Sequence, residues 1–380
     1  DFNKNEYIKQ LIAIYIATCY TYRMKQPILY CVFNRFETIK QTFKPIIEYQ
    51  PSKLYIASDG ARENVSGEKE LIKEIRNFLL QSVNWDCEVH TLFQDNNLGC
   101  DHQMSVASDW FFKNEEMGII IEDDIVATKQ FFNFCSQMLE KYRYDDKISC
   151  ISGLCDVNNI NISYPYDYIF SNNIHFWGWA AWRRSFNDFD IKVRDWNIIK
   201  NNRQFKNAFI SKFTKLNFYN EMETLKLNCP WDLAFKYLNY KNFAFNGKLC
   251  IMPANKRLTT NIGFDGTHAV KEFNSHLGWL PDKLNCDSLK HPPSTEFSYD
   301  YILQLEHLHL NVAVNKYAAN IFKHLFINLV FLMRFVSQIL KLIFALFNKE
   351  KRQHRLCRLS HLKYNAIIYN YVAFKKMTGD

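Results

Sequence analysis

The sequence predicts an α/β fold built on a parallel β-sheet. Strand-like and helix-like patterns alternate from residue 27 to about residue 142, and four strand–helix units in succession favour parallel strands with right-handed crossovers. The segment GIIIEDD at residues 118–124 opens with apolar residues that do not alternate with polar ones, which is typical of a strand covered on both faces.

The expected elements follow in a regular order up to about residue 152. We expect strands at residues 27–33, 53–60, 87–93 and 118–124, and helices at residues 36–48, 68–83, 101–113 and 128–142. The helix at 68–83 carries acidic residues near its start, where the helix dipole favours them. The second half of the chain is less regular, with expected helices near residues 203–227 and 232–239 and two short strands around residues 243–252.

Length and composition indicate a folded protein of roughly two domains' length. The chain has 380 residues, of which 48% are hydrophobic, and its 32 Phe and 21 Tyr residues exclude an intrinsically disordered protein. The eleven cysteines are scattered, odd in number and without a C-x-x-C pair. They therefore suggest neither a disulfide framework nor a zinc site, and a reducing compartment fits best.

The first 23 residues are expected to be an extension that contributes little. Their apolar stretch at residues 11–20 is too short to span a membrane. It also lacks the basic leader and small-residue cleavage site of a signal peptide. The segment MKQPILYCVFNR, which begins at Met24, looks like a natural domain start.

The positive charge of the chain is concentrated near its C-terminus. Residues 320–380 hold 11 Lys/Arg and two acids, a net charge of +9, which leaves about −1 of the total +8 for residues 1–319. On a helical projection of residues 320–358, the polar side chains gather on one side and Phe, Leu, Ile, Val and Met cover the rest; the polar set is Lys323, Arg334, Ser337, Gln338, Lys341 and Asn348. This pattern predicts an amphipathic helix at an anionic membrane surface. The alternative is a helix that packs on the folded domain or on a second copy, and nucleic acid is disfavoured because no recognisable binding module is present.

Three consecutive carboxylates, Glu122, Asp123 and Asp124, follow the predicted strand at 118–124. Side chains at the carboxyl end of a parallel strand lie where open α/β sheets bind ligands. Two hypotheses account for their proximity: the residues belong to a solvated acidic loop, or a bound Mg²⁺ or Mn²⁺ ion relieves their mutual repulsion. The chain contains no G-x-G-x-x-G and no G-x-x-x-x-G-K, which argues against a dinucleotide dehydrogenase and a P-loop ATPase.

Seven motifs occur in order between about Gln26 and Pro293: PILYCVFNR, YIASDGAR, DNNLGC, GIIIEDDIVATKQFF, FWGWAAWRR, CPWDLAFKY and NIGFDGTHA. Together they resemble a nucleotide-sugar glycosyltransferase of the GT-A fold. More narrowly, they resemble bacterial relatives of the Golgi N-acetylglucosaminyltransferase that initiates complex N-glycans. The resemblance implies a donor-binding half at residues 24–152 and an acceptor-binding half at 153–300. The helical, basic character of the last part of the chain separately predicts a tail at residues 301–380.

The resemblance also implies how the donor diphosphate is bound. Transfer of the sugar leaves negative charge on the diphosphate, which a bound cation stabilises as a Lewis acid. The last acid of the motif, Asp124, is the implied metal ligand, while Asp123 and Glu122 lie toward the ribose and the donor sugar. His268, in the loop after Gly266, is implied to ligate the metal or donate to the diphosphate; its alternative is a structural histidine.

Further donor contacts are implied by the earlier motifs. Asp59 corresponds to the carboxylate that reads the base, although a turn-forming Asp before Gly60 is the alternative. Arg35, with Asn34 beside it, resembles the family's arginine near the base and phosphates; the alternative is a surface charge. Gly99 would allow close approach of the nucleotide. His102 stands near the place of a basic residue in relatives, and Asp101 beside it puts a phosphate role in doubt.

Two later motifs are implied to contact the sugars. Trp177, Gly178 and Trp179 would form a platform for a pyranose ring, and the alternative is a hydrophobic cluster of core residues. Asp232, which follows Trp231, is the implied catalytic base that takes the proton from the acceptor hydroxyl. Its alternative is a residue that favours the start of the helix after Pro230.

The resemblance therefore implies an inverting, Mn²⁺- or Mg²⁺-dependent hexosyl- or N-acetylhexosaminyltransferase. The expected donor is a UDP-sugar, and the expected acceptor is a glycan or lipid-linked glycan of a bacterial surface polysaccharide. We expect a cytoplasmic protein on the inner face of the plasma membrane, with homo-oligomerisation left open. The rival hypotheses are a sugar-nucleotide pyrophosphorylase, which needs a glycine-rich loop that YCVFNRFE lacks, and a membrane-peripheral scaffold with an inactive transferase domain.

Overall fold

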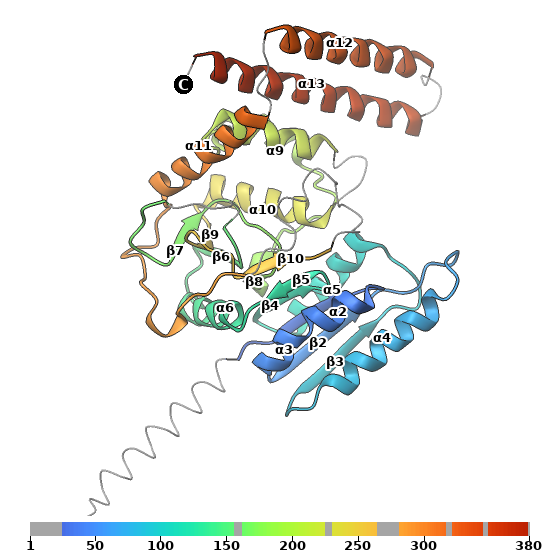
Figure 1. Cartoon of the computed structure of the whole chain (residues 1–380), viewed down its shortest axis with the longest axis vertical. Coiled ribbons are helices and arrows are strands. Elements are labelled where there is room, and N and C mark those ends of the chain that lie inside the picture. The colour runs from blue at the N-terminus through green and yellow to red at the C-terminus, as the bar shows by residue number, and fades with distance from the viewer. Residues whose placement is uncertain are drawn as a thin grey trace, which may run out of the picture. The chain divides into compact units, whose positions relative to one another are not determined.

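The structure is a computed structural model of the whole chain, and it describes residues 25–155, 162–224, 230–263, 281–316, 321–344 and 349–378. It is a mixed α/β protein (Figure 1) with a central sheet of eight strands in the order β3-β2-β1-β4-β8-β6-β9-β7. These strands are β1 Ile28–Val32, β2 Lys53–Ser58, β3 Glu88–Phe93, β4 Met117–Glu122, β6 Ile148–Ser152, β7 Tyr168–Ser171, β8 Trp179–Trp182 and β9 Leu249–Pro253. The predicted extension at residues 1–23 lies outside the described residues.

The sheet is parallel over its first half, as the alternating pattern predicts. β1 pairs in parallel with β2 and β4, and β2 pairs in parallel with β3. β8 then runs antiparallel to both β4 and β6, whereas β6 and β9 are parallel and β7 is antiparallel to β9. All five residues of β1 are buried, as are the first five of β4, which confirms the expectation of strands covered on both faces.

The helices between these strands confirm the predicted order, with one break. They are α2 Phe36–Thr42, α3 Lys44–Tyr49, α4 Glu68–Ser82, α5 Cys100–Asn114 and α6 Lys129–Lys141. The helix expected at residues 36–48 is two helices that meet at Phe43, because Pro45 near the start of α3 has no N–H to continue the α2 hydrogen-bond ladder. Thr128 caps α6 by accepting a hydrogen bond from Phe131 N.

The chain divides into two compact units that are each discontinuous in sequence. The first comprises residues up to Asn159, Pro165–Asn187 and Leu249–Thr295, and the second comprises Ile160–Tyr164, Asp188–Lys248 and Glu296–Asp380. The first unit continues past residue 152, because β6, β7, β8 and β9 complete the sheet that β1–β4 begin. The first unit also contains the 3₁₀ turns η1 Arg183–Phe186 and η3 Cys286–Ser288 and a small antiparallel pair, β5 Ile125–Ala127 with β10 Thr259–Asn261.

The second unit is helical. Its helices are α7 Trp196–Ile199, α8 Arg203–Lys206, α9 Lys212–Thr224, α10 Trp231–Asn246, α11 Tyr299–Lys316, α12 Ile321–Phe344 and α13 Lys349–Thr378. An aromatic core joins several of them, with the Trp196 ring centroid 5.1 Å from Tyr219 and 5.8 Å from Tyr237. The helix α10 replaces the first of the two strands expected around residues 243–252. It continues to Asn246 and ends at Gly247, whose φ of 65° stops a helix readily.

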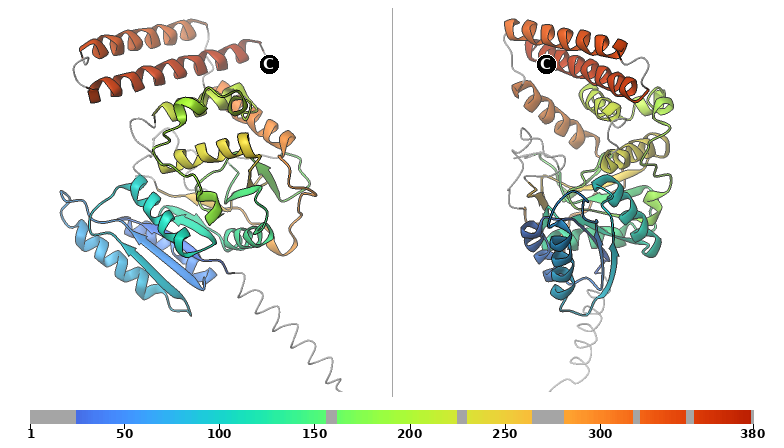
Figure 2. Two further views of the ribbon diagram at one scale, coloured as in Figure 1. Left: turned by 180° about the vertical axis from the view of Figure 1, so that it is seen from behind. Right: turned by 90° about the vertical axis from the view of Figure 1, so that its right-hand side faces the viewer.

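The expected amphipathic segment at residues 320–358 falls on two helices instead of one. α12 and α13 lie side by side in both views of Figure 2, and α13 also packs against α9. The Tyr219 ring of α9 lies 6.4 Å from that of Tyr364 on α13, and Asn220 donates a hydrogen bond to Asn365. The alternative of a helix packed on the folded domain therefore describes α13. No helix in the described parts of the chain is long and apolar enough to cross a bilayer.

Candidate active site at the carboxyl edge of strands β1 and β4

The strand order of the sheet reverses between β1 and β4. The chain proceeds from β1 outward to β2 and β3, and then crosses back so that β4 lies on the other side of β1. In open α/β sheets, ligands bind outside the carboxyl ends of the strands where the strand order reverses in this way. The segment after β1 carries Arg35, and the segment after β4 carries Asp123 and Asp124.

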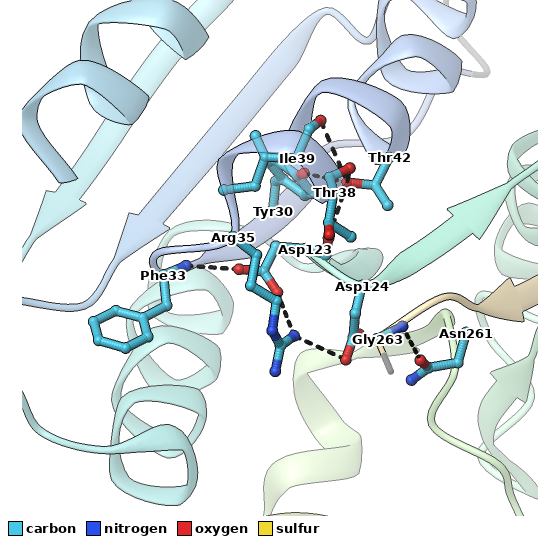
Figure 3. A network of polar contacts seen from close by, with 10 residues as sticks. All are labelled: Tyr30, Phe33, Arg35, Thr38, Ile39, Thr42, Asp123, Asp124, Asn261 and Gly263. Carbon is cyan, nitrogen blue, oxygen red and sulfur yellow. Dashed lines mark hydrogen bonds and ion pairs between the residues drawn. The ribbon is translucent and has the colours of Figure 1, made fainter. Parts of the chain in front are cut away.

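Arg35 lies between the two aspartates (Figure 3). Its Nη1 atom is 2.9 Å from Asp123 Oδ1 and 3.0 Å from Asp124 Oδ2, so one nitrogen contacts both carboxylates. The other oxygen of Asp123 accepts a hydrogen bond of 2.8 Å from Phe33 N. Asp123 is therefore bound by the loop after β1 on both of its oxygens, and the neighbouring strands are joined at their carboxyl ends.

Burial dominates the electrostatics of the pair. It raises the pKa of Asp123 to about 6, against the lowering effect of Arg35, and the nearby Asp124 charge raises that pKa further. Burial also raises the pKa of Asp124, while Arg35 and a hydrogen bond with Asn261 lower it. The two aspartates are thus not part of a solvated acidic loop. Their repulsion is offset by Arg35, the residue that the sequence resemblance assigned to the donor.

Buried hydrogen bonds also hold the backbone of Asp123. The Tyr30 hydroxyl lies 2.6 Å from Thr42 Oγ1, which lies 3.2 Å from the carbonyl oxygen of Asp123. Tyr30 belongs to β1 and Thr42 ends α2, and both are fully buried. A strand, a helix end and the acidic turn are therefore connected by hydrogen bonds that burial shields from water.

Asp124 contacts the first residues of the motif NIGFDGTHA, which the sequence analysis did not assign to the site individually. The pairing of β5 with β10 brings Asn261 opposite Ile125, and Ile262 N then donates a 2.8 Å hydrogen bond to the carbonyl oxygen of Asp124. Gly263 lies so close that an added Cβ would meet Asp124 Oδ2 at 2.7 Å, so a larger residue there would require the Asp124 side chain to shift. The available signal was the glycine two positions after Asn261 in the motif NIGFDGTHA.

The donor atoms at this edge suit a hard cation only in part. Among the described residues, no group of three or more His, Cys, Asp or Glu side chains could hold a metal ion. Mg²⁺ is commonly bound by one or two carboxylates together with substrate phosphates, and Asp124 offers carboxylate oxygen of the kind this requires. Its Oδ2 is engaged by Arg35 at 3.0 Å, so a cation at that oxygen has to share it with the guanidinium or displace it. His268 lies outside the described residues.

Asp59 has a structural role in this arrangement. Its carboxylate accepts hydrogen bonds from Gly60 N and Leu98 N on Oδ1 and from Asn97 Nδ2 and Gly99 N on Oδ2, at 2.8–3.0 Å. Four donors use the acceptor capacity of a carboxylate, which leaves little for a nucleotide base. The side chain is also buried, so the geometry favours the alternative of a loop-forming aspartate that fixes the loop before α5.

The structure explains Gly99 by its backbone conformation. Its φ of 80° is favourable for glycine only, and nothing lies within 4 Å of an added Cβ.

His102 is exposed in the first turn of α5. Asn34 donates a 2.8 Å hydrogen bond to Glu68 Oε1, and Arg62 binds the same carboxylate at 2.6 Å, which lowers the pKa of Glu68.

The tryptophan motif divides between the core and the partly exposed surface. Trp179 on β8 is fully buried, so its indole has no face for a sugar and the core alternative holds for it. Trp177 is half-buried. An added Cβ on Gly178, whose φ is 77°, would meet Thr259 Cγ2 at 2.8 Å and the Phe131 ring at 3.2 Å, which shows that this glycine allows close packing inside the protein.

The implied catalytic base belongs to the second unit. Asp232 is exposed in the first turn of α10, and its Oδ1 accepts a hydrogen bond from Leu233 N at 2.8 Å. Trp231 beside it is buried. The position of Asp232 in the first turn and its hydrogen bond agree with the helix-start alternative. Its exposure leaves the carboxylate accessible, so its catalytic role stays a prediction.

Glu122 is the last residue of β4 and is half-buried. Its register partner on β1 is Cys31. Glu122 directly precedes the turn of Asp123 and Asp124, and its role toward a donor sugar stays a prediction.

No protein-family model matches the chain, and no curated protein matches its sequence. Among solved structures, HddC from Yersinia pseudotuberculosis is 9% identical with a TM-score of 0.28 and covers 42% of this chain and 77% of that chain. TarS 1–349 from S. aureus is 10% identical with a TM-score of 0.32 and covers 93% of this chain and 91% of that chain. At TM-scores this low, neither likeness carries an argument about fold or function, and the assignment has to come from the site itself.

Proposed function

We propose that the chain is a glycosyltransferase that binds a nucleoside-diphosphate sugar at the carboxyl edge of β1 and β4. One observation carries the proposal: a buried pair of aspartates with a shared arginine lies where the strand order of the sheet reverses. The seven motifs of the sequence point to the same class of enzyme. Because no glycine-rich phosphate loop is present, the diphosphate is bound by side chains and a cation.

The chemistry requires positive charge near the leaving diphosphate. Arg35 supplies positive charge at this edge, and its side chain is 22% exposed, so it can reach a ligand in solvent. Asp124 would hold Mn²⁺ or Mg²⁺ together with the diphosphate, and the bound ion would act as a Lewis acid on the leaving group. Asp123, bound through both oxygens, keeps Arg35 and the acidic turn in position.

The finer assignments extend this proposal. The donor is a UDP-sugar, Trp177 supports a sugar ring, and Asp232 accepts the proton of the attacking acceptor hydroxyl, which leads to inversion. The acceptor is a glycan or a lipid-linked glycan. The support for these assignments is the resemblance of the motifs that contain these residues, together with the accessibility of Trp177 and Asp232.

Among the rival hypotheses, a non-catalytic scaffold is the one that the ion pairs would also suit. The ion pairs of Arg35 with Asp123 and Asp124 would stabilise the fold without any ligand, as a purely structural ion triad does. The two functions differ in what they require of Asp124, since only the transferase uses it to bind a cation and donor.

Thermal stability measured with a panel of nucleotide sugars, with and without Mn²⁺, tests the proposal. At about 100 times its Kd, the true donor should raise the free energy of unfolding by about 2.7 kcal/mol. The Asp124→Ala variant should lose the Mn²⁺-dependent part of this effect. Asp109→Ala, which removes an exposed acid of α5, should keep it. If no nucleotide sugar stabilises the wild-type protein, the donor site is wrong and the scaffold reading stands.

A further inference from the structure

Helix α12 exposes a broad apolar face. Among the side chains of this helix that the structure describes, six large apolar ones are exposed, namely Leu329, Leu332, Met333, Phe335, Val336 and Ile339. At about 3.6 residues per turn, these positions fall on one side of the helix. Scattered exposed apolar residues need no explanation, but a contiguous group of this kind marks an interaction site.

The side of α12 that contacts α13 is of mixed polarity. Asn328 exchanges hydrogen bonds with Asn370 of α13, and the Gln338 Oε1 atom accepts one from Arg355 of α13. The Phe331 ring lies 6.0 Å from that of Tyr369, so a limited apolar contact completes this interface. A surface helix normally buries its apolar stripe and exposes its polar side. On α12 large apolar side chains stay exposed instead, which indicates that something else covers them.

The charge around this face identifies the class of partner. No Asp or Glu occurs between Glu306 and Glu350, and residues 320–380 carry a net charge of +9. Arg334 and Lys341 are exposed two helical turns apart on α12, and Arg358 is exposed on α13. A second copy of the chain would bring two positive surfaces together, which is unfavourable. An anionic partner would instead be attracted to the basic residues of α12 and of α13.

We propose that the outward apolar face of α12 docks on the surface of an anionic lipid bilayer. The apolar side chains would enter the boundary between headgroups and acyl chains, with the basic side chains reaching the lipid phosphates. The proposed attachment is to the surface of one leaflet. The inference uses only the second unit and does not depend on the donor site, so each can fail without the other.

Flotation of the full-length protein with lipid vesicles tests the proposal. Vesicles of phosphatidylcholine with phosphatidylglycerol should bind the wild-type protein, and those of phosphatidylcholine alone should bind it much more weakly. Leu332→Glu should reduce binding about tenfold or more, because it places a charge in the apolar face. Lys341→Gln should reduce binding about fivefold.

Matched controls separate this surface from general effects. Ile198→Glu changes another exposed apolar residue of the second unit, which is 75% exposed against 58% for Leu332, and should bind as the wild type does. Lys69→Gln removes an exposed lysine of α4 and should likewise have no effect. Leu329→Glu provides a second variant of the apolar face if Leu332→Glu does not fold.

Three results would overturn the proposal. The wild-type protein does not bind the anionic vesicles, or Leu332→Glu binds them as well as Ile198→Glu does. The third result concerns the oligomeric state in light scattering: the wild type is a dimer, Leu332→Glu is a monomer, and vesicle binding does not change. A second copy of the chain would then be the occupant of this face.

Discussion

Replacement of Arg35 by alanine should destabilise the first unit markedly. It leaves two carboxylates without their shared cation, although their side chains are only 8% and 17% exposed. At an effective dielectric constant of about 20, each contact of about 3 Å corresponds to about 5 kcal/mol of Coulomb attraction. Desolvation of the three groups offsets much of this, and removal of one partner from a buried ion pair costs about 3–5 kcal/mol. We expect a loss in that range.

The measurement is the midpoint of chemical denaturation in the presence of a metal chelator. Lys113→Ala is the matched control, because it removes a cation whose pair with Asp109 is exposed on α5 and should cost at most about 1 kcal/mol. Combining Arg35→Ala with Asp124→Asn should recover part of the loss, since one of the two uncompensated charges is then removed. Mn²⁺ should also stabilise Arg35→Ala more than the wild type if Asp124 holds the ion.

An effect of Arg35→Ala no larger than that of Lys113→Ala would refute this reasoning. It would mean that water or protonation already compensates the two aspartates, and that Arg35 is the surface charge that the sequence left open as its alternative. Equal stabilisation of the variant and the wild type by Mn²⁺ would separately contradict the cation-binding role of Asp124.

Two further substitutions test the loops around the site. Asp59→Asn should lower the free energy of unfolding by about 1–3 kcal/mol, because the amide nitrogen that replaces either oxygen then faces a backbone N–H donor. Asp109→Asn is the exposed control. Equal thermal midpoints for the two variants would contradict the role of Asp59 in fixing its loop. Gly178→Ala should cost more than Gly247→Ala, since both glycines have positive φ but only at Gly178 would the added Cβ meet Thr259, at 2.8 Å; the reverse order in thermal denaturation would show that the strand region yields easily.

The sequence alone was sufficient for the local pattern of the first half. The strands and helices between residues 27 and 142 depend on apolar runs, periodicity and caps that lie within a few residues of each other. The same reasoning failed at residues 243–246, where an aromatic-rich stretch reads as a strand but continues α10. There the rings pack on the helical unit, as in the 5.0 Å pair of Phe243 with Phe297, and such tertiary packing outweighs intrinsic propensity.

The roles of the polar residues required the tertiary structure. The sequence by itself determined that an acidic turn follows a buried strand, that Arg35 follows another and that the positive charge lies near the C-terminus. Only the fold decided that Arg35 joins Asp123 across 88 positions, that the Asp59 carboxylate is used by its own loop and that the apolar side of α12 points outward. The physical reason is that periodicity reports which residues share a face of one element, whereas hydrogen-bond saturation and burial depend on neighbours that are remote in the chain.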